Sequence, residues 1–331
     1  MSEPAMASAA VNVAEFDGSV TSFVPFPPGL RVTEISAQPA NAIERAVTRP
    51  KLSRLRAGAQ AVLASSHGEP IVSHMPRVSL MVAWQKRFWG RKSRHLAFTF
   101  NFTDLPQGSR YRKAWAPLED VTRFIVFSAF ERELYSAHFG LPIERFERLL
   151  WAQTTPVVAP TNAFATPGNY VAAVGGEGRD HVTLMRAAAM LPHIPFLVVC
   201  RPHNRLPEIP ANVTVHTNLD APTSWRITQD AACSIVPLKS AETCCGHITI
   251  VGSELVGTPV VATRSAATVE YTEDVAQCEP GDAQGLAALI DHAFRSSATL
   301  RAETQARIPA KLAKYDRDAW QRSIADFLAG G

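Results

Sequence analysis

From residue 170 to residue 296, short apolar runs alternate with amphipathic segments, and this alternation constrains the fold more than any other feature. The apolar runs predict strands at 170–174, 195–200, 212–216, 233–237 and 259–263. The segments between them predict helices at 180–190, 224–232, 246–256 and 283–295. Strands that alternate with helices form a parallel sheet covered by helices. The second half is therefore expected to be a doubly wound, Rossmann-like α/β unit.

The first half shows the same alternation in a weaker form. Apolar runs predict strands at 59–66, 95–102 and 123–128. Apolar residues at helical spacing predict helices at 71–88 and 129–139, and the second of these should end at Gly140. An earlier strand is expected at 22–26 or at 31–36, and prolines interrupt the first of these two runs. A second Rossmann-like unit is expected here.

The chain is long enough for two such units. It has 331 residues, of which 46% are hydrophobic and 19% charged, so it can bury two ordinary cores. Residues 154–169 (TTPVVAPTNAFATPGN) are rich in Pro, Thr and Asn and separate the two patterns. We predict a flexible tail at 1–20, an N-terminal domain at 21–158, a linker at 159–169, a C-terminal domain at 170–300 and a helical segment at 301–331.

Charge and cysteine content exclude several classes of protein. The net charge of +3 comes from 33 basic and 30 acidic residues, which is too balanced for a nucleic-acid binder. The five cysteines lack the paired spacing of a zinc or redox site, which fits a reduced cytoplasmic protein without a metal. The N-terminus does not fit a secretory signal, and no apolar run approaches about 18 residues. Any membrane contact should be peripheral.

Residues 234–270 carry the most informative pattern. They read SIVPLKSAETCCGHITIVGSELVGTPVVATRSAATVE, which predicts a strand, a polar loop, a helix opening at Cys245-Gly246 and a second buried strand. A helix that follows a glycine-containing loop presents free N–H groups and the positive end of its dipole. Such a helix start suits a nucleotide diphosphate.

This stretch resembles the glycosyl transferases group 1 family, in which a strand ending in Pro precedes a Glu-bearing loop, a Gly-containing helix start and G-T-P-V-V-A. Residues 174–180 (VGGEGRD) and the helix after them are similar to the family's G…K-D-x-x-x-L-x-x-A. Residues 212–216 match a further family strand, and FIVFSAFERELYSAHFGLP matches more loosely. The resemblance spans residues 60–295. It implies the GT-B fold, with two Rossmann-like domains facing across a cleft and a C-terminal helix crossing back.

The resemblance also implies that the C-terminal domain binds a nucleoside diphosphate sugar. Arg179 stands where the family has its diphosphate-binding Lys. A cation near a helix start opposes the dipole and calls for an anionic partner, although a plain surface residue is the alternative. Cys245 and Gly246 should offer backbone amides to the diphosphate. His247 opens the same helix, and it either hydrogen-bonds the donor or fills a first-turn position.

The sequence departs from the family at one position. Gly252 stands where the family has the Glu that contacts the nucleotide ribose. Glu254 lies two residues later, about 200° away round a helix, so it cannot simply replace that carboxylate. Glu242 lies two residues before the position of the family's first Glu, in a loop. It is either a ligand of the donor sugar, the reading we favour, or a solvated loop acid.

Asp104 is the candidate base in the first half. It follows the strand expected at 95–102, and polar groups at the carboxyl ends of parallel strands face ligands. A carboxylate there could take the proton of an acceptor hydroxyl. The alternative, placed ahead of the base, is a helix N-cap, because Asp before Pro106 and a helical stretch suits capping.

Residues 70–103 contain no acid but many cations and aromatic residues. Anionic lipid headgroups attract such a surface, whereas the alternative is a solvated helix end with its aromatics in the core. The residues expected at a membrane surface are Trp84, Lys86, Arg87, Trp89, Arg91, Lys92 and Arg94.

Together these features predict a metal-independent, cofactor-free glycosyltransferase of the hexosyltransferase type, cytoplasmic or peripheral on the inner membrane face. It would transfer a sugar from a nucleoside diphosphate sugar to a glycan or lipid-linked acceptor, as in polysaccharide biosynthesis, and would not bind nucleic acid. Two alternatives stay open. One is a nucleotide-sugar epimerase or hydrolase of the same fold. The other is a catalytically degenerate GT-B partner in glycan assembly, which Gly252 motivates.

Overall fold

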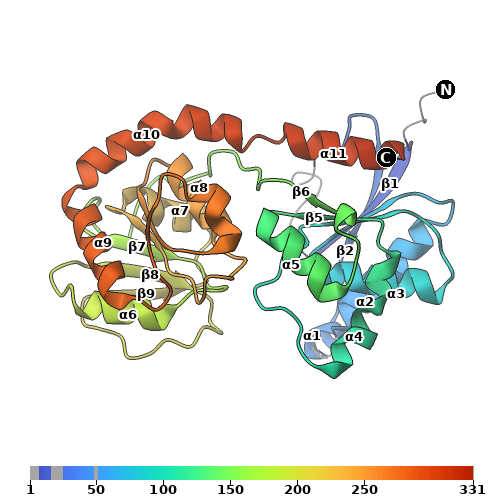
Figure 1. Ribbon diagram of the computed structural model, residues 1–331, viewed down its shortest axis with the longest axis horizontal. Helices are drawn as coiled ribbons and strands as arrows, with labels where there is room; N and C mark the ends of the chain where they lie inside the picture. Colours follow the sequence, from blue (N-terminus) through green and yellow to red (C-terminus); the bar gives the residue numbers. More distant parts are fainter. Residues whose placement is uncertain (1–6, 16–24, 48–50, 331) are drawn as a thin grey trace. The chain divides into compact units, whose positions relative to one another are not determined.

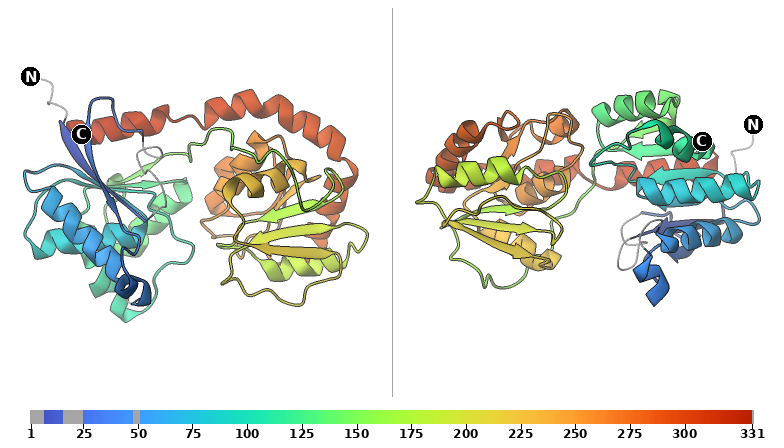
Figure 2. Two further views of the ribbon diagram at one scale, coloured as in Figure 1. Left: turned by 180° about the vertical axis from the view of Figure 1, so that it is seen from behind. Right: turned by 90° about the horizontal axis from the view of Figure 1, so that it is seen from below.

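The computed structural model describes residues 7–15, 25–47 and 51–330 (Figure 1). The chain divides into a first unit, Met1–Leu150 with Arg317–Gly331, and a second unit, Trp151–Asp316. Each unit holds one six-stranded sheet with parallel pairing, and Figure 2 shows helices on both faces of each sheet. The predicted α/β class with two Rossmann-like units is confirmed.

The first unit has the sheet order β2-β1-β3-β4-β5-β6. The strands are β1 (Ala9–Ala14), β2 (Arg31–Ser36), β3 (Ile71–His74), β4 (His95–Phe98), β5 (Arg123–Val126) and β6 (Phe146–Arg148). The helices are α1 (Ala42–Ala46), α2 (Leu52–Ala64), α3 (Pro76–Phe88), α4 (Ser109–Trp115), α5 (Ala129–Phe139) and α11 (Asp318–Ala329). Short 3₁₀ turns span Ala116–Asp120 and Ile143–Arg145.

Apolar residues of β1 and β3 join the sheet to α2 and α3. Val11 pairs with Ile71 across the two strands, and both are buried in one cluster with Ala61 and Val78. Helix α5 ends at Gly140, whose φ of 65° lies in the left-handed region that glycine tolerates. This end was predicted from the sequence, as were β2, β4 and β5.

Helix α11 returns the chain to the first unit, as the predicted crossing C-terminal segment requires. Its buried Trp320 packs edge to face on Phe98, with ring centroids 4.9 Å apart. The Trp320 indole Nε1 donates to the carbonyl of Leu150 over 2.7 Å. The last helix is therefore part of the first core.

Three predictions for the first half were wrong. The tail expected at 1–20 contains β1, which is buried between β2 and β3. The strand expected at 59–66 lies in α2, because its small apolar residues face α3 at helical spacing. The helix expected at 71–88 begins with β3 and becomes helical only at Pro76. The run at 22–26 lies partly outside the described residues.

The second unit has the sheet order β12-β11-β10-β7-β8-β9. The strands are β7 (Val171–Val174), β8 (Phe196–Cys200), β9 (Val213–Thr217), β10 (Ser234–Val236), β11 (Val260–Thr263) and β12 (Ala276–Cys278). The helices are α6 (His181–Ala189), α7 (Ala221–Asp230), α8 (His247–Leu255), α9 (Ala283–Arg295) and α10 (Ser297–Lys314), and a 3₁₀ turn spans Ala266–Tyr271. The strands and helices expected between residues 170 and 295 all occur.

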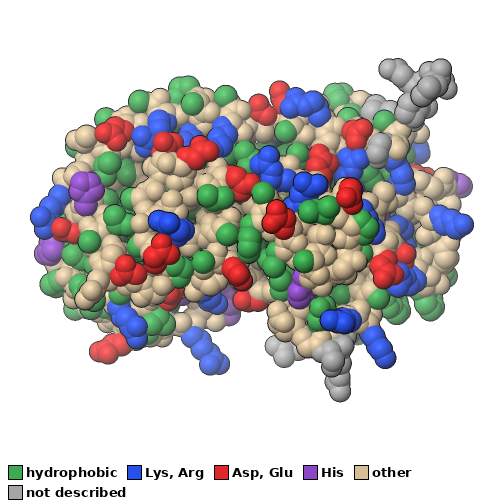
Figure 3. Space-filling model, viewed as in Figure 1, with side chains coloured by type: hydrophobic (Ala, Val, Ile, Leu, Met, Phe, Trp, Pro, Cys, Tyr) green, Lys and Arg blue, Asp and Glu red, His purple; other side chains and the backbone are tan. Residues whose placement is uncertain are grey.

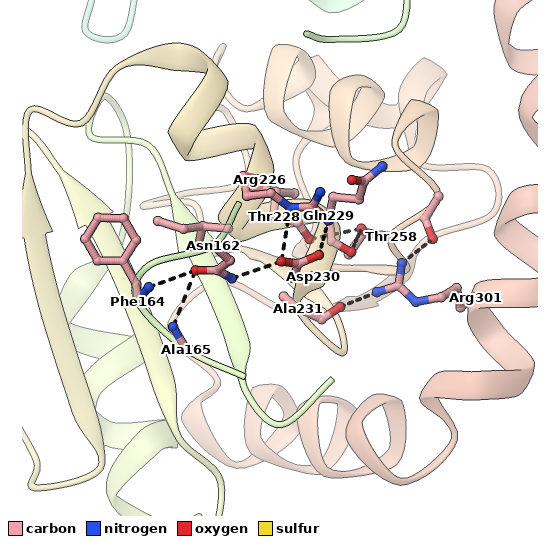
Figure 4. A network of polar contacts seen from close by, with 12 residues as sticks. Asn162, Phe164, Ala165, Arg226, Thr228, Gln229, Asp230, Ala231, Thr258 and Arg301 are labelled. Atoms are coloured by element: carbon pink, nitrogen blue, oxygen red, sulfur yellow. Dashed lines mark hydrogen bonds and ion pairs between the residues drawn. The ribbon is translucent and has the colours of Figure 1, made fainter. Parts of the chain in front are cut away.

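The segment expected as a linker is fixed to the second unit (Figure 4). Asn162 Nδ2 donates to Asp230 over 3.1 Å and to the Tyr170 hydroxyl over 2.9 Å. Asp230 also pairs with Arg226, one turn earlier in α7. Nearby, Arg301 of α10 donates to the carbonyl of Ala231. Polar contacts of this kind hold irregular chain against the sheet, since a buried loop must satisfy its polar groups.

Candidate functional site

The strand order of the second sheet contains a topological switch point. From β7 the chain adds β8 and β9 on one side of the sheet, and it then returns to add β10, β11 and β12 on the other side. The switch point therefore lies between the neighbouring strands β7 and β10. Ligands of open α/β sheets bind outside the carboxyl ends of the strands at such a point. The candidate site is therefore the crevice formed by residues 175–181 after β7 and residues 237–247 after β10.

The two loops of this crevice pair with each other. Arg179 and Leu238 form an isolated antiparallel bridge. On either side of it, the N–H of Asp180 donates to Pro237 over 3.0 Å, and the N–H of Lys239 donates to Gly178 over 3.2 Å. This pairing places the starts of α6 and α8 at the same edge of the sheet.

The two helices begin differently. Asp180 caps α6, because its side chain accepts from the N–H of Thr183 over 3.0 Å. Helix α8 begins after Gly246, which supplies no side-chain cap. Its first-turn N–H groups therefore form an uncapped, positively polarised end next to the crevice, which suits an anion.

Arg179 lies under this helix start and is 6% exposed. Its Nη2 donates to Thr249 Oγ1 of α8 over 2.9 Å, and its Nη1 donates to the carbonyl of Glu177 over 3.1 Å. Among the described residues, Nε has no hydrogen-bond partner and no carboxylate lies within ion-pair distance of the guanidinium. Burial lowers the pKa of Arg179. A buried cation without a counter-ion is costly, so the arrangement favours binding of an anion.

Glycines make room for Arg179. At Gly175, with φ of +127°, a Cβ would lie 2.7 Å from the Nη2 of Arg179. At Gly246, with φ of +101°, a Cβ would lie 3.0 Å from Val236 Cγ1 and 3.7 Å from the Nη1 of Arg179. A side chain at either position would displace the guanidinium or the start of α8, and both backbones are unfavourable for other residues.

His247 and Cys245 are buried at the same helix start. Burial, reinforced by the positive charge of Arg179, lowers the pKa of His247 to about 3. Its ring centroid lies 5.5 Å from those of Trp151 and Tyr271. The imidazole is therefore neutral at pH 7. The structure brings four predicted residues together here, namely Arg179, Cys245, Gly246 and His247.

Glu242 belongs to the same loop, but its side chain is exposed. The backbone N–H of Glu242 donates to Ser240 Oγ over 3.2 Å, which shapes the turn. The loop is thus ordered by its own hydroxyl groups while the carboxylate faces outward. A role in holding the donor sugar stays a prediction.

Asp104 lies in the first unit, in the irregular segment after β4, and its side chain is exposed. The capping alternative is wrong, because α4 begins at Ser109 and its N-cap position is Gly108. Asp104 therefore has no N-cap function at this helix. Its role as an acceptor base stays a prediction.

The position of Gly252 in α8 is closed to a larger side chain. A Cβ there would lie 2.1 Å from Cη2 of Trp225 and 2.7 Å from Nε2 of Gln153. The indole of Trp225 therefore occupies the space that a carboxylate at residue 252 would need. Glu254 cannot serve instead, because its carboxylate pairs with Lys311 over 3.0 Å.

Two residues of the crevice, a histidine and a lysine, were missed in the sequence. His181, the first residue of α6, is 7% exposed, and neither ring nitrogen has a hydrogen-bond partner among the described residues. Lys239 is exposed and forms no ion pair within the described part of the chain. The sequence could have indicated Lys239, since it closely follows a predicted buried strand. It could not have indicated His181, because the burial of this ring depends on the fold around it.

No protein family model matches the sequence, and no curated protein matches it. Solved structures match over nearly the whole chain. Sucrose-phosphate synthase from Thermosynechococcus elongatus is 15% identical with a TM-score of 0.69, and the match covers 97% of this chain and 98% of that one. HepE from Anabaena in complex with UDP-glucose is 14% identical with a TM-score of 0.68, covering 97% and 100%.

A UDP-forming trehalose-phosphate synthase from Burkholderia xenovorans is 9% identical with a TM-score of 0.68, and the match covers 98% of this chain and 99% of that one. At these identities the likeness establishes the fold. The chain has the GT-B fold that the resemblance implied.

Proposed function

We propose that the chain is a glycosyltransferase that moves a sugar from a nucleoside diphosphate sugar to an acceptor hydroxyl. The observation that carries the proposal is the buried guanidinium of Arg179, which lacks a carboxylate partner in the described chain and lies at the switch point under the uncapped start of α8. A diphosphate is the anion that fits a helix start and a cation in this position.

In the proposed reaction, the acceptor oxygen bonds to the anomeric carbon while the bond from that carbon to the diphosphate oxygen breaks. The electron pair of the broken bond goes to the leaving diphosphate. Arg179 and the amides at Cys245, Gly246 and His247 stabilise the negative charge that develops there. The acceptor proton goes to a base, and Asp104 is the proposed base.

Two further residues complete the proposed donor site. Glu242 would accept hydrogen bonds from the sugar hydroxyls, since its carboxylate is exposed on the loop between β10 and α8. His247, neutral at pH 7, would donate or accept one hydrogen bond without adding charge. Because protein cations and amides stabilise the leaving group, we expect the reaction to need no metal ion or other cofactor.

The proteins of similar fold support this donor class. The HepE structures contain UDP, UDP with glucose, or UDP-glucose. The trehalose-phosphate synthase is described as UDP-forming. A hexose attached to a nucleoside diphosphate is therefore the donor that we propose for this chain.

One observation favours a second candidate, a degenerate GT-B partner in glycan assembly. The indole of Trp225 fills the space beside Gly252, so no carboxylate can reach a ribose from this position. A nucleotide-sugar epimerase or hydrolase of the same fold is the other alternative to transfer. Nucleotide binding separates the active candidates from the degenerate one.

The testing experiment is a thermal-shift panel of UDP-, GDP- and ADP-sugars, followed by donor turnover with and without an added acceptor. Stabilisation by one nucleotide series and acceptor-dependent release of its nucleoside diphosphate are expected. Turnover that ignores the acceptor would indicate a hydrolase or an epimerase. Absence of any shift or turnover would leave only the degenerate partner.

We place the acceptor at the cytoplasmic membrane face, which would make the enzyme a peripheral one that uses a lipid-linked or polysaccharide acceptor. The support is the end of α3 and the residues after it. Trp84 is 43% exposed and Trp89 is 52% exposed, and the Trp84 ring stacks on that of Phe88 with centroids 5.6 Å apart. Arg91 and Lys92 beside them are exposed. We call these five residues the α3 patch.

Three other cations expected on this surface have partners inside the first unit. Lys86 is buried, and its Nζ donates to the carbonyl of Asp120 over 3.0 Å. Arg87 pairs with Asp120 over 2.7 Å, and Arg94 donates to the carbonyl of Phe327. The α3 patch is thus smaller than the sequence predicted.

Basic and acidic side chains are intermixed on the face in Figure 3, so a membrane contact must rest on this local cluster. No helix within the described ranges is long and apolar enough to cross a membrane.

A further inference from the structure

Lys239 is the exposed cation of the crevice. It follows β10 directly after Pro237 and Leu238, and its backbone N–H donates to Gly178 in the opposite loop over 3.2 Å. Its ammonium forms no ion pair with any described residue. The two acids of the facing loop are engaged elsewhere. Asp180 accepts from the N–H and hydroxyl of Thr183, and Glu177 pairs with His203 over 3.0 Å. Neither of these carboxylates forms an ion pair with Lys239.

The antiparallel bridge places Arg179 on the α8 side of the crevice. Leu238 and Arg179 face the start of α8, because a Cβ at Gly246 would lie 3.2 Å from Leu238 Cδ2 and 3.7 Å from the Nη1 of Arg179. Lys239 follows Leu238 in a bend, and its backbone N–H donates to Gly178. Its exposed side chain therefore starts beside the loop that leads into α6.

His181 is the first residue of α6 and follows this loop directly. Its pKa is lowered chiefly by burial and then by the charge of Arg179, while the charge of Asp180 raises it and that of Lys239 lowers it further. Its two ring nitrogens are buried without partners among the described residues. A buried polar group without a hydrogen bond is costly, so this ring gains by rotating to meet a hydrogen-bonding ligand.

Arg179 alone offers little to a ligand. Its two Nη atoms already donate to Thr249 and Glu177, and the side chain is 6% exposed. Its guanidinium adds positive charge from beneath and fixes the start of α8, but direct contacts with an anion require additional donors. Besides the amides at the start of α8, the crevice offers two side-chain donors, Lys239 and His181.

We infer that Lys239 and His181 bind the donor diphosphate directly. This inference rests on the proposed function and extends it, because it assigns the contacts with the phosphates to residues other than Arg179. The diphosphate would then lie between the amides of α8 and the ammonium of Lys239, with the imidazole of His181 as a second hydrogen-bonding group.

The test is calorimetric titration of the full chain with UDP, GDP and ADP, followed by the best of them against Lys239→Met and His181→Gln. A direct charge-assisted contact predicts a loss of about tenfold or more in affinity for Lys239→Met, and a smaller loss of several-fold for His181→Gln. Arg295→Met and His193→Gln remove exposed groups of the same unit outside the crevice. These controls should bind as the unchanged chain does.

The possible outcomes separate the inference from the function on which it rests. Unchanged affinity in Lys239→Met, in a chain that binds a nucleoside diphosphate, would overturn the inference and leave the proposed function intact. If the unchanged chain binds none of the three nucleotides, the proposed function itself fails. Because Lys239 is exposed, its substitution should leave the melting temperature unaltered, so a loss of affinity would not reflect misfolding.

Discussion

The ammonium of Lys311 lies 3.0 Å from the carboxylate of Glu254, and both side chains are buried. The same ammonium lies 3.1 Å from Asp274. This pair joins α8, whose first turn borders the crevice, to α10 on the outside of the second unit. The carboxylate of Glu254 is therefore committed to the packing of the helix that carries the candidate site.

Lys311→Ala should destabilise the second unit strongly, because it leaves the Glu254 carboxylate buried without its partner. Breaking a buried ion pair from one side costs about 3–5 kcal/mol, which urea denaturation would measure. Lys314→Ala is the matched control, since Lys314 pairs with the exposed Glu273 and such pairs contribute about 0–1 kcal/mol. Equal losses for the two variants would show that the buried pair has no special role.

Arg179→Ala should weaken nucleotide binding by roughly 1–3 kcal/mol, the scale of one charged interaction, because the positive charge beneath the start of α8 is lost. It should also lower the melting temperature, because the guanidinium holds the hydroxyl of Thr249 and the carbonyl of Glu177. Calorimetry with a nucleoside diphosphate measures the first effect and thermal unfolding the second. Unaltered affinity would remove Arg179 from the donor site.

Asp104→Asn should reduce turnover by about 10²-fold or more if this carboxylate is the acceptor base. Donor affinity and melting temperature should stay nearly constant, because Asp104 is exposed and caps no helix. Initial rates at saturating donor would measure the change. Normal turnover in this variant would mean that another group accepts the proton.

The buried His247 predicts an acid-sensitive second unit. Its pKa is about 3 in the folded chain against an ordinary 6.5, so below pH 6.5 the unfolded state binds a proton that the folded state does not. The free energy of unfolding should therefore fall as the pH drops from 6.5 toward 3, with His247 contributing about 2 kcal/mol of this loss by pH 5. Urea midpoints at pH 7 and pH 5 would measure it.

In His247→Gln the free energy of unfolding should change less between pH 7 and pH 5 than it does in the unchanged chain. The exposed His193 serves as a control, because its replacement by Gln should not alter that change. If the pH dependence in His247→Gln were unchanged, His247 would not be the cause of the loss of stability at acid pH.

The second unit was predictable from sequence because most of its strands are short apolar runs, and β7, β9, β10 and β12 are each followed by an α-helix. The side chains of three aspartates, Asp180, Asp220 and Asp282, cap helices there. Such N-cap residues can be recognised in a sequence. In the first unit, β1 has the sequence AAVNVA and β3 has only four residues. Neither shows periodicity by itself. Their pairing with each other across about sixty residues decides their structure. The local sequence of either strand does not reveal such a long-range contact.

The candidate site was predictable to a similar extent. A glycine-containing loop before a helix pointed to Gly246, and the charge at a helix start pointed to Arg179. The burial of Arg179 and the position of Lys239 in the same crevice depend on the bridge between residues 179 and 238, two segments almost sixty residues apart. Likewise, only the packing of Trp225 explains why residue 252 has no side chain.

The α3 patch predicts where the protein acts. Trp84, Phe88 and Trp89 are exposed together, and aromatic rings of this kind favour the interface of a bilayer. Arg91 and Lys92 each add about 1 kcal/mol of attraction near an anionic surface. The protein should therefore co-sediment with anionic but not with neutral liposomes.

Salt is the first control for this binding, because raising its concentration shortens the Debye length and should release the protein. A double variant, Arg91→Glu with Lys92→Glu, should abolish sedimentation without altering stability, since neither side chain forms an ion pair within the described residues. Lys113→Glu changes an exposed lysine of the same unit outside the patch and should sediment normally. Equal, negligible binding to both liposome types at low salt would contradict membrane docking and favour a soluble acceptor.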